Sequence, residues 1–113
     1  MPLQKKEERM STKVIISYRL REGRTREEYY KWSRELDQPV ASRQPGVLGY
    51  EIYDITGSGT DEEPWCDIIE VIEAESWEAW AKVNSYEEMH PVVESWRKLC
   101  IPESVRVIYG KAV

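Results

Sequence analysis

The alternation of apolar and polar residues along the chain predicts four strands separated by two helical regions. Four short segments are rich in β-branched and other apolar residues, as strands are: residues 13–20, 47–56, 65–73 and 104–109. The two longer segments between them carry apolar residues three and four positions apart, which is the period of an amphipathic helix. The order strand–helix–strand–strand–helix–strand predicts an α+β, ferredoxin-like fold. Such a fold has one four-stranded antiparallel sheet with both helices on one face.

The first helical region has a clear start and an ambiguous end. Thr25 and Glu28 have the spacing of a capping box, in which each side chain binds a free backbone N–H at the helix start. Pro39 has no N–H and must break or kink the helix. Asp37 stands two residues ahead of it, in position to cap a short second piece that runs to about Arg43. The predicted apolar face consists of Tyr29, Trp32, Leu36 and Val40.

The second helical region is predicted in two pieces. Ser76 is expected to cap the first piece, and Ser85 with Glu88 forms a second capping box at the start of the next. Between the second and third strands, an acidic loop at 57–64 favours an antiparallel hairpin. The apolar residues of the two helical pieces are Trp77, Trp80, Ala81, Val83, Met89, Val92, Val93, Trp96 and Leu99.

The strands are apolar in both of their alternating phases. In the first strand, the neighbours Ile15 and Ile16 belong to opposite phases, and both are apolar. The same holds for Ile68 and Ile69 in the third strand. The helices cover only one face of the sheet, and no segment is left over to cover the other. Because exposed apolar sheet is a liability, a second copy of the chain is the economical cover. The sequence therefore predicts a homodimer.

Composition sets limits on partners and location. The 113 residues fit one domain, expected at 13–113 after a charged, disordered tail at 1–12. The net charge is −5 and the basic residues are scattered, so neither nucleic acid nor an anionic membrane is an expected partner. No apolar segment has the roughly 20 residues of a membrane span. Cys66 and Cys100 are the only cysteines; we expect reduced thiols, Cys66 serving in packing, in a cytoplasmic protein without cofactor or metal.

Several segments together carry a family pattern: Arg26–Tyr29 with Trp32 and Asp37–Pro39, Pro64 with Asp67–Ile72, Ser85–Met89, and Val107–Gly110. Over residues 13–113 they resemble the REDY-like (HapK) family. The resemblance implies a dimeric α+β barrel, in which two sheets wrap together with helices outside. It also implies an association with secondary metabolism, namely prodigiosin-type tripyrrole pigment biosynthesis.

Two shorter resemblances point to neighbouring branches of the same superfamily. Pro45–Tyr50 followed by Glu51–Tyr53 is similar to the second strand of antibiotic-biosynthesis monooxygenases. His90–Pro91 resembles the His-Pro step of stress-responsive barrels, which include a polyketide cyclase with a catalytic histidine at that step. These resemblances imply chemistry without a cofactor on an aromatic polyketide.

His90 is the first candidate catalytic residue. It is the only histidine, and imidazole is the side chain whose ordinary pKa suits proton transfer near neutral pH. Pro91 disturbs helical geometry at this point, and Tyr86 lies four residues earlier on the same helical face. We therefore predict that His90 faces the cleft between helices and sheet. The alternative is a surface histidine bonded to water.

Asp37 and Glu70 are the carboxylate candidates. Asp37 is either a helix cap or a group that accepts a hydrogen bond from a pyrrole N–H or acts as a base. Glu70 lies in the middle of a strand, where an unpaired charge is costly to bury. It is expected on a solvated phase, in a salt bridge with Arg19 or Arg106, or facing a polar pocket; the resemblance favours the pocket.

Aromatic residues suggest what such a pocket would hold. The chain has 5 Trp and 7 Tyr but no Phe, so its aromatic bulk also brings hydrogen-bonding groups. Three function classes stay open: a binding protein or cofactor-free enzyme for a planar aromatic or pyrrolic molecule, a cofactor-free monooxygenase, and a non-catalytic carrier or partner subunit. Residues expected to line a flat aromatic slot are Tyr29, Trp32, Trp80, Tyr86 and Trp96.

Overall fold

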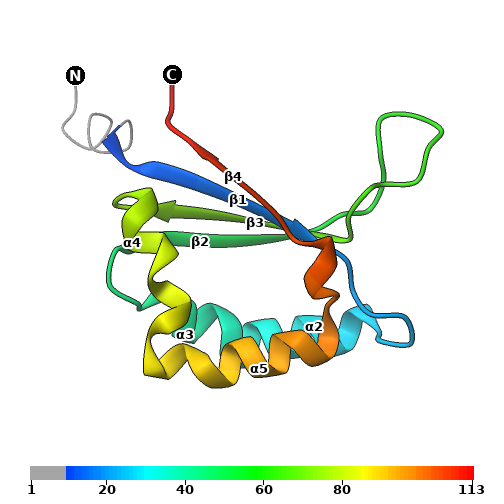
Figure 1. Ribbon diagram of the computed structural model, residues 1–113. Coiled ribbons are helices and arrows are strands. Elements are labelled where there is room, and N and C mark those ends of the chain that lie inside the picture. The colour runs from blue at the N-terminus through cyan, green and yellow to red at the C-terminus, as the bar shows by residue number, and fades with distance from the viewer. Residues whose placement is uncertain (1–9) are drawn as a thin grey trace.

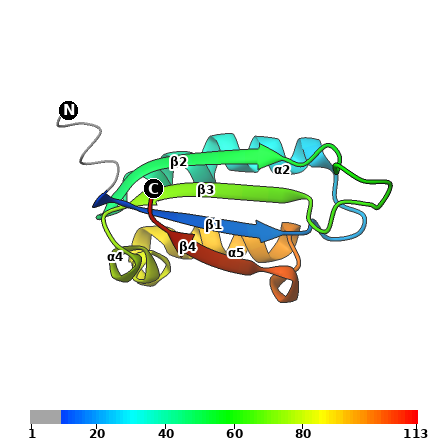
Figure 2. The same cartoon turned by 90° about the horizontal axis from the view of Figure 1, so that it is seen from above.

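The computed structural model describes residues 10–113 and has the predicted ferredoxin-like arrangement. One antiparallel sheet has the strand order β2-β3-β1-β4. Figure 1 shows the helices beneath this sheet, and Figure 2 shows the four strands side by side from above. The strands are β1 (Thr12–Tyr18), β2 (Val47–Asp54), β3 (Ile68–Ala74) and β4 (Arg106–Gly110).

The helical regions are more segmented than predicted. The first consists of α2 (Arg26–Trp32), the π-helical turn η1 (Ser33–Asp37) and α3 (Gln38–Ser42). The second consists of α4 (Trp77–Ala81), two 3₁₀ turns η2 (Val83–Ser85) and η3 (Glu87–Met89), and α5 (His90–Leu99). A further 3₁₀ turn, η4 (Pro102–Ser104), leads into β4. None of the helices formed by the described residues is long and apolar enough to span a bilayer.

The predicted strand ends differ from the observed ones by up to three residues, and the start of β2 at Val47 coincides with the prediction. Strand β1 begins at Thr12, one residue before the predicted start of the domain. The preceding Ser11 is buried, and its hydroxyl donates a hydrogen bond of 3.1 Å to the Glu73 carboxylate. The rest of the predicted tail, residues 1–9, lies outside the described residues. The folded domain therefore begins slightly nearer to the N-terminus than the charged composition of the first residues predicted.

The structure settles which strand phase faces the helices. Tyr50, Ile72, Val14 and Tyr109 form one row across the inner face, and Ile52, Glu70, Ile16 and Val107 form the next. The outer face carries a row of Glu51, Val71, Ile15 and Ile108, of which Ile108 is 65% exposed. A buried carboxylate thus lies in an otherwise apolar inner row, while aliphatic residues lie exposed on the outer face.

Pro39 does not break the first helical region, because a wider turn accommodates it. The Gln38 N–H bonds to the Ser33 carbonyl, five residues back, and Pro39 then lies in the first turn of α3, where its missing N–H is not needed. Thr25 accepts a hydrogen bond from the Glu28 N–H at the start of α2, as predicted. The extra residue of the π-helical turn brings Asp37 onto the inward side, where it is buried.

Of the two caps predicted in the second region, one is confirmed and one is wrong. The Ser76 hydroxyl accepts a hydrogen bond from the Ala79 N–H at the start of α4. The Ser85 hydroxyl instead donates to the Lys82 carbonyl, and the Glu88 carboxylate pairs with Arg43 of the first region. Glu88 therefore joins the two helical regions rather than capping a helix.

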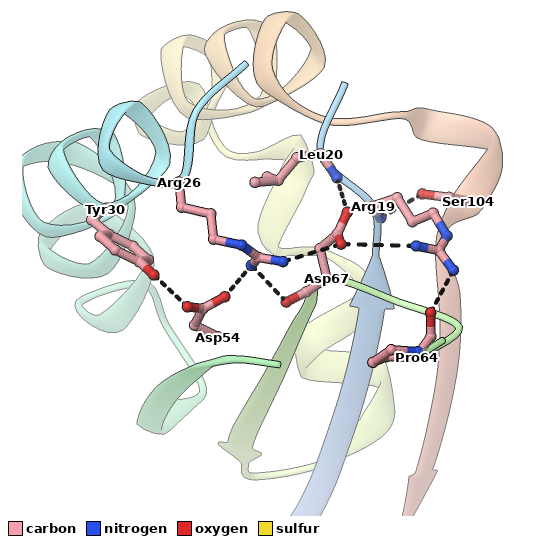
Figure 3. Close-up of polar contacts among 8 residues, drawn as sticks. All are labelled: Arg19, Leu20, Arg26, Tyr30, Asp54, Pro64, Asp67 and Ser104. Carbon is pink, nitrogen blue, oxygen red and sulfur yellow. Dashed lines mark hydrogen bonds and ion pairs between the residues drawn. The ribbon is translucent and has the colours of Figure 1, made fainter. Parts of the chain in front are cut away.

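A polar cluster holds the ends of the loop between β2 and β3 (Figure 3). Arg26, in the first turn of α2, pairs with Asp54 at the end of β2 and, at 3.3 Å, with Asp67 just before β3. The Asp67 carboxylate also accepts a bond from the Leu20 N–H. Arg19 donates to the Pro64 carbonyl at 2.7 Å. Every carboxylate in this cluster has a partner, so we assign it a structural role at the end of the sheet away from η1.

Candidate functional site

A cavity of about 420 Å³ lies between the inner face of the sheet and the helices. Its wall is mainly aromatic and aliphatic. Trp32 comes from the end of α2, Trp80 from α4 and Trp96 from α5, and all three line the cavity as predicted. Trp77 also lines it and stacks on Tyr109, with ring centroids 4.5 Å apart. The wall therefore offers several flat apolar surfaces drawn from separate elements.

Two buried carboxyl groups, Asp37 and Glu70, interrupt this apolar wall. Asp37 is 3% exposed and Glu70 is 6% exposed, and both line the cavity. Asp37 reaches it from the π-helical turn and Glu70 from the middle of β3. Taking two carboxyl groups out of water costs free energy, so hydrogen bonds from other groups must offset this cost.

Two tyrosine hydroxyls contact the two carboxyl groups, and a third tyrosine hydroxyl contacts one of these two. The Tyr50 hydroxyl lies 3.0 Å from one Glu70 oxygen, and 3.2 and 3.3 Å from the two Asp37 oxygens. The Tyr18 hydroxyl bonds to the other Glu70 oxygen, and the Tyr29 hydroxyl lies 2.5 Å from that of Tyr18. Tyr50 thus bridges the two acids, and the chain of contacts runs from Asp37 to Tyr29.

Burial shifts the pKa values of all these groups upward. Desolvation, followed by the nearby Glu70 charge, raises the pKa of Asp37 well above its usual range, and the Tyr50 hydrogen bond only partly opposes this. Desolvation also raises the pKa of Glu70, against hydrogen bonds from Tyr18 and Tyr50 that favour its charged form. The Tyr50 phenol pKa is raised by burial and then by the two carboxylates. The site therefore holds protons more tightly than the same side chains do in water.

The structure decides the alternatives for both acids. Asp37 makes no side-chain hydrogen bond to the start of α3, so its capping role is wrong. Glu70 lies on the buried phase and pairs with neither predicted arginine, which excludes the solvated and salt-bridged alternatives. Arg19 pairs with Asp67, at 3.8 Å, and Arg106 lies over the Trp65 ring. The remaining interpretation, a carboxylate facing a pocket, is the one observed.

His90 does not lie in this cavity. Its side chain is exposed at the first position of α5, and it is not among the residues that line the cavity. The prediction that it faces the cleft is wrong, because Met89 at the end of η3 and Val92 in α5 are the residues of this segment that lie in the core. The argument for a catalytic His90 therefore loses its structural basis.

The two predicted tyrosines of the slot also lie outside the cavity wall. Tyr86 packs beside the cluster around Val83 and Met89 without lining the cavity. Tyr29 is fully buried behind the wall and takes part only through its hydroxyl contact with Tyr18. Cys66 is buried, in keeping with a role in packing, and burial raises its thiol pKa.

Tyr18 and Tyr50 are the site residues that the sequence argument missed. Both lie on strands, where an aromatic residue alone is ordinary. The available signal was strand phase: a hairpin with Ile52 opposite Glu70 places Tyr50 one step along on the same face. That register is continuous from Gly49 to Asp54, and the loop of the hairpin is too long for its length alone to predict it.

Comparison with solved structures gives the class of protein, a ferredoxin-like α+β domain. The chain is similar to HapK from Hahella chejuensis, with 14% identity over 90% of this chain and 92% of that one, and a TM-score of 0.72. It is also similar to an ethyl tert-butyl ether d (ethd) family protein from Bacillus halodurans, with 15% identity over 92% and 100% and a TM-score of 0.69. A third is SnoaB, a cofactor-independent oxygenase from Streptomyces nogalater, with 11% identity over 91% and 93% and a TM-score of 0.65. At these identities the likeness concerns the fold alone.

Comparison of the sequence with family models identifies the family. The chain belongs to the HapK family, whose model is described as REDY-like protein HapK and matches residues 12–113. No curated protein matches the chain. The predicted family is thus confirmed over nearly the whole chain.

Proposed function

We propose that the protein binds a planar aromatic or pyrrolic small molecule in the cavity between helices and sheet, in a secondary-metabolic pathway of the prodigiosin type. The observation that carries this proposal is the pair Asp37 and Glu70, bridged by Tyr50, in a cavity walled by tryptophans. Its volume lies within the range of roughly 300–1,000 Å³ usual for small-molecule sites.

The chemistry of the wall fits this class of ligand. Indole rings stack on flat aromatic surfaces, and such contacts contribute beyond the area they bury. Carboxyl oxygens accept hydrogen bonds from N–H groups, which planar pyrroles present at their edge. An apolar wall with a few convergent polar groups is the usual composition of a specific ligand site.

Binding is tested by titrating the protein with 2,2′-bipyrrole and following tryptophan fluorescence. We expect saturable quenching. Trp80→Ala, which removes a cavity wall, should weaken binding about tenfold, or roughly 1.4 kcal/mol. Trp65→Ala is the matched control, because Trp65 is 59% exposed and does not line the cavity; binding should persist in it. Absence of saturable quenching in the folded protein, or equal loss in both variants, would contradict the proposal.

A cofactor-free oxygenase is the second candidate, favoured by the fold shared with SnoaB. In this case a buried carboxylate would take the proton from a phenolic substrate before the substrate reacts with dioxygen. Oxygen consumption with an anthrone, lost in Glu70→Gln, supports this activity. Binding of the anthrone without oxygen consumption favours a carrier instead.

We also propose a homodimer, formed through the outer face of the sheet. The exposed Ile15 and Ile108 on that face support it, as does the similar Thermobifida fusca structure, described as a dimeric ferredoxin-like protein. Sedimentation should give twice the chain mass at micromolar concentration, and a monomer would contradict the proposal. We expect the dimer to be cytoplasmic, where the two thiols stay reduced.

A further inference from the structure

The hydrogen atoms in the carboxyl–tyrosine chain can be counted. Four pairs of side chains are in hydrogen-bonding contact: Tyr29 with Tyr18, Tyr18 with Glu70, Glu70 with Tyr50, and Tyr50 with Asp37, whose two oxygens share the Tyr50 hydroxyl. Each contact needs one hydrogen, but three phenols supply only three. If both acids were ionised, one contact would bring two oxygens together with no hydrogen between them. The hydrogen count therefore favours a proton on one of the two carboxyl groups.

The contacts also indicate which acid carries the proton. Glu70 receives two phenol hydroxyls, one on each oxygen, and hydrogen bonds of this kind stabilise a carboxylate. Within residues 10–113, the one hydrogen-bonding partner of Asp37 is the Tyr50 hydroxyl, shared between its oxygens. A proton on either acid meets the hydrogen count, so the choice rests on the two phenol donors at Glu70. With the proton on Asp37, Asp37 donates to Tyr50, Tyr50 to Glu70, Tyr29 to Tyr18, and Tyr18 to Glu70.

We propose that Asp37 carries this one proton at neutral pH while Glu70 stays ionised, and that the cavity accordingly selects a planar ligand with a protonated, N–H-bearing nitrogen. This proposal rests on the proposed function and adds the charge of the ligand to it. Desolvation, followed by the nearby Glu70 charge, raises the pKa of Asp37 well above its usual range, in agreement with this assignment.

In the part of the chain that the structure describes, no cation pairs with the Glu70 carboxylate. The groups that face the pair are phenols: Tyr18 from β1, Tyr29 from α2 and Tyr50 from β2. Among the described residues, none of the ion pairs involves Asp37 or Glu70.

Two further titratable groups lie nearby, and neither of them pairs with the Glu70 charge. Arg97 of α5 lines the cavity, but its side chain is exposed. Cys100 is buried, and its thiol pKa is raised by desolvation and then by the Glu70 charge, so it stays neutral. A ligand that brings its own positive charge would neutralise the buried carboxylate, whereas an anion would add to it.

Ligand charge is tested by calorimetric titration with two planar tricyclic compounds. We expect 9-aminoacridine, a cation with an N–H edge at neutral pH, to bind at least about tenfold more tightly than anthracene-9-carboxylate. Glu70→Gln should erase this preference, and Glu63→Gln, the same change on an exposed loop residue, should retain it. Equal affinities, or a preference for the anion, would overturn the assignment of charge while leaving a planar-ligand site intact. If neither compound nor bipyrrole binds, the proposed function itself fails.

The position of the proton is tested without ligand by infrared spectroscopy of the wild-type protein. A carboxylic-acid C=O band should be present at neutral pH. It should shift when aspartate carries ¹³C at its side-chain carboxyl, and stay in place when glutamate is labelled instead. Asp37→Asn should remove it. A band that shifts with the glutamate label, or absence of any such band, would overturn the proposal.

Discussion

Replacing Asp37 by Asn should change how the stability of the protein depends on pH. In the folded protein, burial raises the pKa of Asp37 well above its usual range, while in the unfolded chain it returns to about 3.9. Between these two values the folded state holds a proton that the unfolded state has released. The contribution of Asp37 to stability is therefore complete below about pH 3.9 and is lost as the pH rises through the folded pKa.

Linkage gives the size of this effect. One extra proton bound by the folded state lowers the free energy of unfolding by about 1.4 kcal/mol for each unit of rising pH. The raised pKa of Glu70 has the same sign but is opposed by two phenol hydrogen bonds. Glu73, whose pKa is lowered mainly by Lys13, has the opposite sign, and its contribution is complete by about pH 5. The range from pH 5 to 8 therefore isolates the buried pair.

The assay is urea unfolding at half-unit steps from pH 5 to 8. The free energy of unfolding of the wild-type protein should fall relative to that of Asp37→Asn, whose amide cannot ionise and can still donate to Tyr50. Asp61→Asn, the same change in the exposed loop, should run parallel to the wild type. Parallel curves for Asp37→Asn and the wild type would refute a raised pKa at Asp37.

Three further substitutions test other parts of the structure. Gly46→Ala should destabilise the fold by more than about 1 kcal/mol in urea unfolding, because φ is +84° and the new Cβ would lie 2.7 Å from a side chain of α4. Gly23→Ala is the control: its φ is +86°, but the space around it is open, so it should destabilise the fold less. Arg26→Ala should speed proteolysis within the loop between β2 and β3, whereas Arg24→Ala, which breaks only a surface pair, should not. His90→Ala should leave bipyrrole binding intact and change stability by less than about 0.5 kcal/mol.

The fold could be predicted because its signals are local and repeated. Runs of β-branched and other apolar residues define the strands, and helical spacing in Tyr29 and Val40 places both of them in the core, as observed. The ends of the helices were harder to predict, because a side chain that could cap a helix can bind another partner instead. Ser76 caps the start of α4, as the sequence predicts. Glu88 instead pairs with Arg43 of the other helical region, and the residues next to Glu88 in sequence do not predict this partner.

The candidate site could be predicted only in part, because its geometry depends on contacts between distant segments. The position of Asp37 follows from a π-helical turn that absorbs Pro39, whereas a rule applied to proline alone predicts a break and makes Asp37 a cap. Tyr50 meets Glu70 only through the register of β2 on β3. The tryptophans were easier to place, since large apolar residues on the inward faces of helices have few other places to go.

His90 is the one side chain of the sequence with an ordinary pKa near neutral pH, which made it the first candidate for proton transfer. The structure assigns proton chemistry differently, by moving ordinary acids out of water. A buried carboxyl group beside an anionic one has its pKa raised, so Asp37 is suited to hold a proton at a pH where an exposed aspartate has lost it. Such a site needs no histidine. It needs a phenol placed between two acids, and Tyr50 has that position because β2 pairs with β3 and lies across from the π-helical turn.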